Sequence, residues 1–205
     1  EGHIGANSLF ALESAILKAI AKEKKVEVWQ LINPNAKKFP RLVGNCVGGG
    51  KHSGSGTDSK RKPDFQEFLL IPKTNSVKEA FEINKEGKKE AGNSLKKVDE
   101  KFDGKKNDED AWKTSLNEKE VLDVLKNLKL PLGVDVAASS FYKRKKYHYQ
   151  NPLLERTADE QISYLANLIK NFELFYVEDP FDEDDFSSFA KLLKKYSDSL
   201  IVGDD

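Results

Sequence analysis

Residues 173–179 read ELFYVED, a short apolar run that ends directly in two carboxylates. The same pattern recurs at residues 130–136 (LPLGVDV) and at residues 200–205 (LIVGDD). Short apolar strands that alternate with helices are typical of a parallel sheet that is covered on both faces. The sequence therefore predicts an α/β fold, and periodicity alone leaves a barrel and a doubly wound sheet as alternatives.

Helical patterns fill the intervals around these runs, at residues 118–128, 157–170 and 183–196. Thr157 and Glu160 have the spacing of a capping box, which predicts that the second of these helices begins after Thr157. The resulting order of strand, helix, strand, helix and strand supports the parallel arrangement.

The first half of the chain is less regular. Apolar residues at helical spacing predict a helix from Ser8, its N-cap, to Lys24. A long irregular connection is expected over residues 33–62, which are rich in Gly, Ser, Pro and Lys. The segments expected after it are a strand at residues 65–71, a polar helix at residues 76–97 and a charged connection at residues 99–110.

Composition and charge exclude several classes of function. The chain has 205 residues, 38% hydrophobic and 33% charged, which suits one domain or two small ones with a real core. Because 34 Lys and Arg balance 34 Asp and Glu, no nucleic-acid or anionic-membrane surface is expected.

The lone Cys46 predicts a soluble protein of a reducing compartment. The chain opens at Glu1 and contains no methionine, so we expect a partial sequence.

Carboxylates follow all three strands of the second half, as Asp135, Glu178-Asp179 and Asp204-Asp205. The C-terminal ends of parallel strands meet at one edge, so these side chains are expected to face one volume. Oxygen ligands from several strands suit a hard divalent cation, and Mg²⁺ in particular. The alternative is that each acid is a helix N-cap or a turn residue, as acids after strands commonly are.

Three other candidates carry a weaker signal. His52 follows Gly48-Gly49-Gly50, whose glycines allow a close backbone approach to a ligand, although an isolated loop histidine is more often solvated. Gln66-Glu67 lies inside an apolar strand, so at least one of these side chains faces a buried surface or a pocket. Glu109 lies in an acidic run that by composition is a solvated loop.

Six motifs combine these candidates in one order along the chain. They are Gly5-Ala6-Asn7-Ser8, Asn45 through Gly49-Gly50-Lys51-His52, Gln66-Glu67-Phe68-Leu69-Leu70-Ile71-Pro72, Gly133-Val134-Asp135-Val136-Ala137-Ala138-Ser139, Val177-Glu178-Asp179-Pro180-Phe181 and Ile201-Val202-Gly203-Asp204-Asp205. Together they resemble the enolase family, the phosphopyruvate hydratases. The resemblance covers nearly the whole chain and about the middle half of a family sequence.

The resemblance implies an architecture of two parts. Residues 1–38 look like the last helices of an α+β N-terminal domain. Residues 39–205 look like the first part of the enolase C-terminal domain, an incomplete TIM-like barrel. The expected fold is thus an α/β barrel segment that follows a helical segment.

The resemblance also implies a role for each candidate residue. Asp135, Glu178 and Asp204 look like the family's ligands for Mg²⁺. Glu109 falls where the family has its general acid, and Glu67 would assist it. The positions that match substrate-binding residues of the family are His52, Gln66, Glu67 and Asp205.

The implied activity is the Mg²⁺-dependent, reversible dehydration of 2-phosphoglycerate to phosphoenolpyruvate in glycolysis and gluconeogenesis, by a cytoplasmic carbon–oxygen lyase. The base lysine is expected beyond Asp205, so this segment alone should be inactive. The full-length protein is expected to form a homodimer or a larger homo-oligomer, with no nucleic-acid or membrane partner. The alternatives are a catalytically inactive enolase-like binding or structural module, and a superfamily member that acts on another carboxylate substrate.

The sequence departs from the family pattern in three places. Asp110-Ala111 stand where a glycine pair usually follows the acid, and Ser140 stands where a glutamate is usual. Extra residues also extend the loop over about residues 56–62. These departures are what a non-catalytic module would permit.

Overall fold

The computed structural model describes residues 4–51, 53 and 61–204. The chain divides into two compact units, Glu1–Pro40 and Arg41–Asp205. The boundary that the family resemblance implies, after Lys38, lies two residues before the end of the first compact unit. Assignment of the first unit to an N-terminal domain of the family stays a prediction.

The first unit contains the helices α1 (Ala6–Lys24) and α2 (Val28–Ile32). The prediction that Ser8 caps α1 is wrong, because the helix begins earlier, with Gly5 as its N-cap. The carbonyl of Gly5 already accepts the N–H of Leu9 at 3.2 Å, which places Ser8 inside the helix. Lys25 ends α1 in the left-handed conformation, as residues beyond a helix C-terminus often do.

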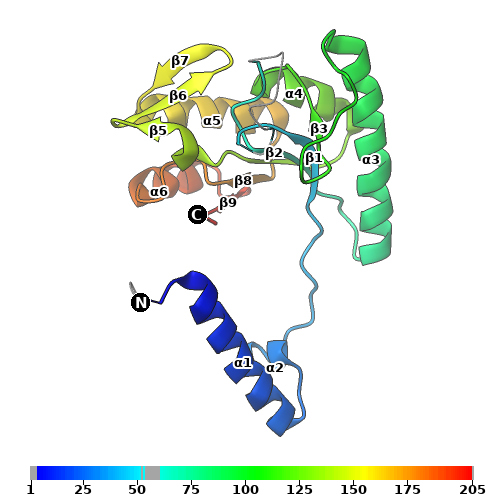
Figure 1. Cartoon of the computed structure of the whole chain (residues 1–205), viewed down its shortest axis with the longest axis vertical. Helices are drawn as coiled ribbons and strands as arrows, with labels where there is room; N and C mark the ends of the chain where they lie inside the picture. Colours follow the sequence, from blue (N-terminus) through cyan, green and yellow to red (C-terminus); the bar gives the residue numbers. More distant parts are fainter. Residues whose placement is uncertain (1–3, 52, 54–60, 205) are drawn as a thin grey trace. The chain divides into compact units, whose positions relative to one another are not determined.

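The second unit is built on a six-stranded sheet (Figure 1). β4 pairs with β8 and β8 with β9, both in parallel, which confirms the predicted parallel arrangement. β2 runs antiparallel to both of its neighbours, β1 and β4, which the sequence pattern did not reveal. Across the sheet the strands are β3 (Trp112–Lys113), β1 (Gly44–Gly48), β2 (Glu67–Leu70), β4 (Leu132–Asp135), β8 (Tyr176–Glu178) and β9 (Leu200–Val202).

Strand β1 lies inside the segment that the sequence predicts to be irregular, so that prediction is wrong for Gly44–Gly48. Its glycines lower the strand propensity, yet the packing requires one of them. A Cβ on Gly48 would lie 2.3 Å from Nδ2 of Asn107, closer than any carbon can approach. The strand therefore forms because two neighbours pair with it, and Gly48 lets the chain at Asn107 pass close over it.

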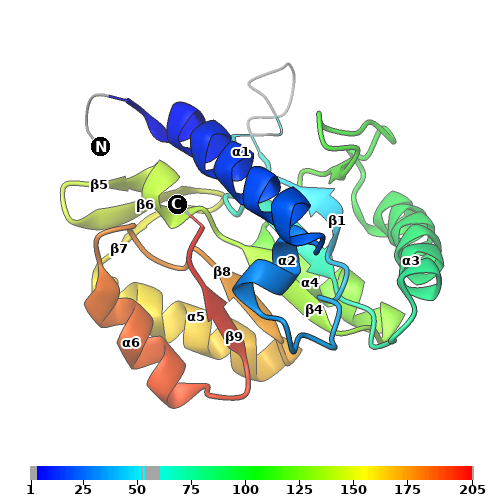
Figure 2. The ribbon, with the colours of Figure 1, turned by 90° about the horizontal axis from the view of Figure 1, so that it is seen from below.

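Helices cover the sheet, and most of them begin at a side-chain cap. The caps of α3, α4, α5 and α6 are Ser76, Asn117, Thr157 and Asp185, each accepting a backbone N–H from the first turn. Figure 2 shows α5 and α6 side by side along β8 and β9, with α3 next to β1 on the other side of the unit. The helices are α3 (Val77–Val98), α4 (Glu118–Leu125), η1 (Lys126–Leu128), η2 (Ala138–Phe141), α5 (Ala158–Phe172) and α6 (Phe186–Lys195).

A second, three-stranded antiparallel sheet follows η2. Its strands are β5 (Tyr142–Lys143), β6 (Lys146–Gln150) and β7 (Leu153–Arg156). Tyr147 and Tyr149 of β6 point into the core and are almost fully buried. The core joins this sheet to the main one, since the rings of Tyr149 and Phe65 lie 6.4 Å apart.

Candidate functional site

One register of the main sheet carries a row of carboxylates. Glu67 of β2 pairs with Asp135 at the end of β4, and Asp135 pairs with Glu178 at the end of β8. Because β2 is antiparallel to β4, the start of β2 lies at the same edge as the ends of β4 and β8. The strand directions therefore bring Glu67 beside two of the acids that follow the parallel strands.

A tight group of carboxylates continues this edge toward the end of the chain. Glu178, Asp179 and Asp204 each offer an oxygen, and the three oxygens lie within 4.8 Å of one another. The N–H of Asp204 also donates to Oδ1 of Asp179 at 2.8 Å. Carboxylate oxygens at this spacing are the donor set of a hard divalent cation. The two predicted ligands Glu178 and Asp204 are thus brought together.

Asp179 is a member of this group that the sequence prediction did not select as a ligand. Its side chain is buried, and its backbone has φ 42°, in the left-handed region. Strict strand alternation would send neighbouring side chains to opposite faces, but the chain leaves β8 at this residue and turns. The signal available in the sequence was its position directly after Glu178.

Asp135, the third predicted ligand, lies outside that group among the residues described. Its carboxylate is buried and accepts hydrogen bonds from Nε2 of Gln66 at 3.2 Å and from the N–H of Ala137 at 2.9 Å. Asp135 therefore links the predicted substrate-binding Gln66 to the row of acids, one strand away from Glu178.

Glu67 and Glu109 meet, although the two residues are far apart in sequence. Glu109 accepts a hydrogen bond from Nδ2 of Asn45 at 2.9 Å, which places it over β1 beside β2. Burial, a hydrogen bond to Glu109 and the negative charges of Glu109, Asp135 and Glu178 raise the pKa of Glu67 to about 8. A carboxyl group with its pKa raised in this way favours its protonated form, so Glu67 can hold a proton next to Glu109.

Two predicted substrate-binding residues, His52 and Asp205, lie outside the described residues. Cys46, on β1, is buried, and burial raises the pKa of its thiol to about 12. A thiol in this state is protonated and is a poor nucleophile.

The comparisons of the sequence with known proteins point to one family. Residues 36–205 match the model of the enolase C-terminal TIM barrel domain. The chain belongs to the enolase family. This confirms the resemblance seen in the six motifs and identifies the six-stranded sheet as part of an enolase barrel.

Curated enolases from archaea are similar along nearly the whole chain. The chain is 39% identical to the enolase of Pyrobaculum aerophilum, over 98% of this chain and 50% of that protein. It is 35% identical to the enolase of Methanosphaera stadtmanae, over 98% of this chain and 51% of that protein. The enolase of Natronomonas pharaonis is also 35% identical, over 98% and 52% of the two chains. The chain thus spans about half the length of the enolases it matches.

Membership of the enolase family implies a divalent metal, and the carboxylates at this edge fit one. Glu178, Asp179 and Asp204 supply charged oxygen donors and no sulfur or imidazole, which suits a hard cation better than zinc.

Within the described part of the chain, none of the helices is long and apolar enough to cross a bilayer.

Proposed function

We propose that the complete protein is a phosphopyruvate hydratase, which converts 2-phosphoglycerate reversibly into phosphoenolpyruvate and water. The observation that carries the proposal is the contact between Glu67 and Glu109 at the end of a row of acids that continues through Asp135 to Glu178. A carboxyl pair that holds a proton lies beside carboxylates suited to a cation. This combination serves a reaction in which an acid must protonate a departing hydroxide while negative charge is neutralised.

Asp135, Glu178 and Asp204 are the proposed ligands of Mg²⁺. Asp179 would position Asp204, because its Oδ1 holds the N–H of that residue at 2.8 Å. Gln66 would orient Asp135 through its amide, 3.2 Å from Oδ2. When bound, Mg²⁺ supplies positive charge that stabilises the extra negative charge on the substrate carboxylate after a proton leaves the neighbouring carbon.

Glu109 is the proposed general acid. In the dehydration, the bond between carbon 3 and its hydroxyl oxygen breaks, the oxygen takes both electrons, and Glu109 gives it a proton so that water leaves. Glu67 would assist by holding a proton beside Glu109, because burial, the hydrogen bond to Glu109 and the negative charges around it raise the pKa of Glu67. The base that removes the first proton is expected outside this chain.

The proposal includes His52, Gln66 and Asp205 as residues that contact the substrate, a cytoplasmic location and a homo-oligomeric assembly. These follow from the family resemblance.

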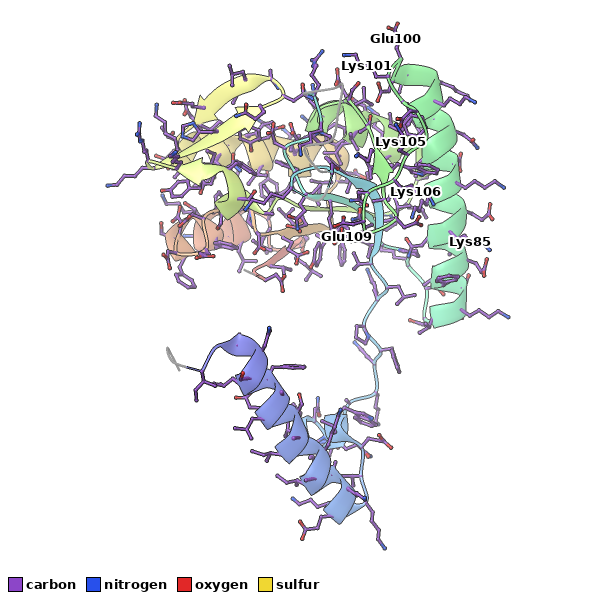
Figure 3. The ribbon with its side chains drawn as sticks, viewed as in Figure 1. Lys85, Glu100, Lys101, Lys105, Lys106 and Glu109 are labelled. Atoms are coloured by element: carbon purple, nitrogen blue, oxygen red, sulfur yellow. The ribbon has the colours of Figure 1, made fainter. Side chains whose placement is uncertain are left out.

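The test is an assay of phosphoenolpyruvate formation by the complete protein, with and without Mg²⁺, for the wild type and Glu109→Gln. We expect Mg²⁺-dependent turnover that falls about 10²- to 10⁴-fold in the variant, with little change in Mg²⁺ or substrate binding. Glu100→Gln is the matched control, since Glu100 is an exposed glutamate just beyond α3 (Figure 3). Near-normal turnover in Glu109→Gln would remove Glu109 from this role. Absence of turnover in the wild type would refute the proposed activity.

A further inference from the structure

The segment that carries Glu109 forms no regular helix or strand. Residues 99–111, all of them described, contribute a single bridge to Trp112, from Lys106. Glu109 itself is exposed to solvent. A catalytic carboxyl on such a segment needs contacts that hold the segment in place, because freedom of the chain lowers the fraction of productive geometries.

Asn107 closes the turn around Glu109 from within. Its Oδ1 accepts the N–H of Glu109 at 3.0 Å and the N–H of Ala111 at 2.9 Å. Its own N–H donates to the carbonyl of Ala111, also at 2.9 Å. These bonds fix the shape of the turn, and the close approach of Asn107 to Gly48 places the turn over β1. Gly48 pairs with Glu67 in the sheet, so the turn lies directly beside the acid row.

Asp110 ties the same turn to helix α3. Its Oδ2 lies 2.6 Å from Nζ of Lys88 on α3, and its Oδ1 lies 2.7 Å from Nζ of Lys106. Hydrogen bonds from the two lysines lower the pKa of Asp110 to about 2, and the bond from Lys106 has the larger effect. Lys106 also lies over the ring of Trp112, 5.0 Å from its centre, and Nε1 of Trp112 donates to the carbonyl of Lys88 at 2.7 Å. Figure 3 shows Lys106 on the α3 side of this segment and Glu109 at its other end.

The backbone at Asp110 limits which residues the turn accepts. Asp110 has φ 63°, in the left-handed region, where glycine is unstrained and where Asn and Asp are the most readily accepted of the other residues. Glycine would therefore suit the turn better if only the backbone mattered. The aspartate adds a carboxylate whose two oxygens each meet a lysine.

We propose that Asp110 is a positioning residue for Glu109, acting through the ion pairs with Lys88 and Lys106. The pair with Lys88 holds the turn against α3, and the pair with Lys106 braces the turn from within. Together they keep the carboxyl of Glu109 in contact with Glu67. The proposal rests on the proposed function, in which Glu109 is the acid, and it adds how this chain places that acid.

The test compares Asp110→Asn and Asp110→Gly with the wild type in the complete protein. Both variants accept the left-handed backbone, and both remove the charge. We expect kcat to fall about 10-fold in each, with KM for 2-phosphoglycerate changed less than about 2-fold, because the loss concerns orientation of the acid. Added KCl should lower kcat of the wild type more than that of the variants, since salt screens the pairs.

The matched control is Asp103→Asn. Asp103 is another exposed aspartate of the same segment, and its partner, Lys105, lies within the segment as well. We expect this variant to keep the kcat of the wild type. A second check is Lys88→Met, which removes only the pair that reaches α3. Its kcat should fall, by no more than that of Asp110→Asn, and the double variant should match Asp110→Asn alone. An unchanged kcat in Lys88→Met would contradict the role of this pair.

The outcomes separate the two proposals. An inactive wild type refutes the proposed function. If the wild type is active and both Asp110→Asn and Asp110→Gly keep the kcat of the wild type, the positioning role of Asp110 is refuted. The role is also refuted if the fall in kcat is accompanied by a lower melting temperature and a higher KM, because that result indicates a general loss of structure.

Discussion

Glu118 offers a test of how burial controls a charge in this unit. It is the first residue of α4, and only 2% of its surface is exposed. Oε1 accepts the N–H of Asp64 at 2.7 Å, and Oε2 lies 3.3 Å from the hydroxyl of Tyr164. Burial raises the pKa of Glu118 from 4.5 to about 7. The hydrogen bond from the N–H of Asp64 opposes this shift, and the negative charge of the Asp64 side chain adds to it. The substitution Glu118→Gln keeps the shape and removes the charge.

The sign of the effect follows from the two protonation states. Between pH 4.5 and about 7 the unfolded chain loses the Glu118 proton and the folded chain keeps it. The free energy of unfolding therefore falls as pH rises through this range and is constant above it. At about 1.4 kcal/mol per pKa unit, the full penalty is about 3 kcal/mol near pH 8 and about 1 kcal/mol near pH 5. The neutral amide of the Glu118→Gln variant carries no such penalty, and it can still accept from Asp64 and donate to Tyr164.

The assay is urea unfolding of the complete protein between about pH 5 and pH 8. The free energy of unfolding of Glu118→Gln, relative to the wild type, should increase by about 2 kcal/mol over this range. Glu90→Gln, at an exposed position of α3, is the matched control and should change by less than about 0.5 kcal/mol. A difference between Glu118→Gln and the wild type that stays constant with pH would refute the reasoning.

Two further predictions concern the acid row and its turn. Gly48→Ala places a methyl group 2.3 Å from Nδ2 of Asn107, and that side chain cannot swing away without losing its bonds to the turn. We expect a loss of about 1–3 kcal/mol in urea unfolding together with lower turnover, and an unchanged protein would contradict this packing. Asp179→Asn keeps the acceptor for Asp204 and removes one charge, so titration calorimetry should show about 10-fold weaker Mg²⁺ binding than in the control Asp184→Asn. Equal affinities would exclude Asp179 from the metal site.

Much of the second half of the fold could be predicted from local sequence. The apolar runs that became β4, β8 and β9 are short and bounded by helical patterns, and Thr157 with Glu160 forms the predicted capping box. These features depend on neighbours within a few residues, so the sequence contains them directly. The predicted helix start at Ser8 was wrong, because a serine near the start of a helix is only one of several residues that can cap it, and here the cap is Gly5.

The site itself was predictable in its members and much less in its geometry. Residue types at strand ends indicated a cation site, and the family motifs pointed to Glu67 and Glu109. The roles of His52 and Asp205 stay predictions. The inclusion of Asp179 in the carboxylate group depends on a turn at one residue, which no periodicity records.

The order of residues was sufficient to locate α3, α4, α5 and α6, the parallel strands, the acids at their ends and the family, but not η2 or the three-stranded sheet. The packed chain was needed to establish that β2 runs antiparallel, that β1 is a strand, and that Asp110 reaches Lys88 on α3. The difference is one of range. Periodicity and capping act between residues close in the chain, whereas strand direction, the fit of Asn107 over Gly48 and the ion pairs of Asp110 depend on which distant segments fill the same space.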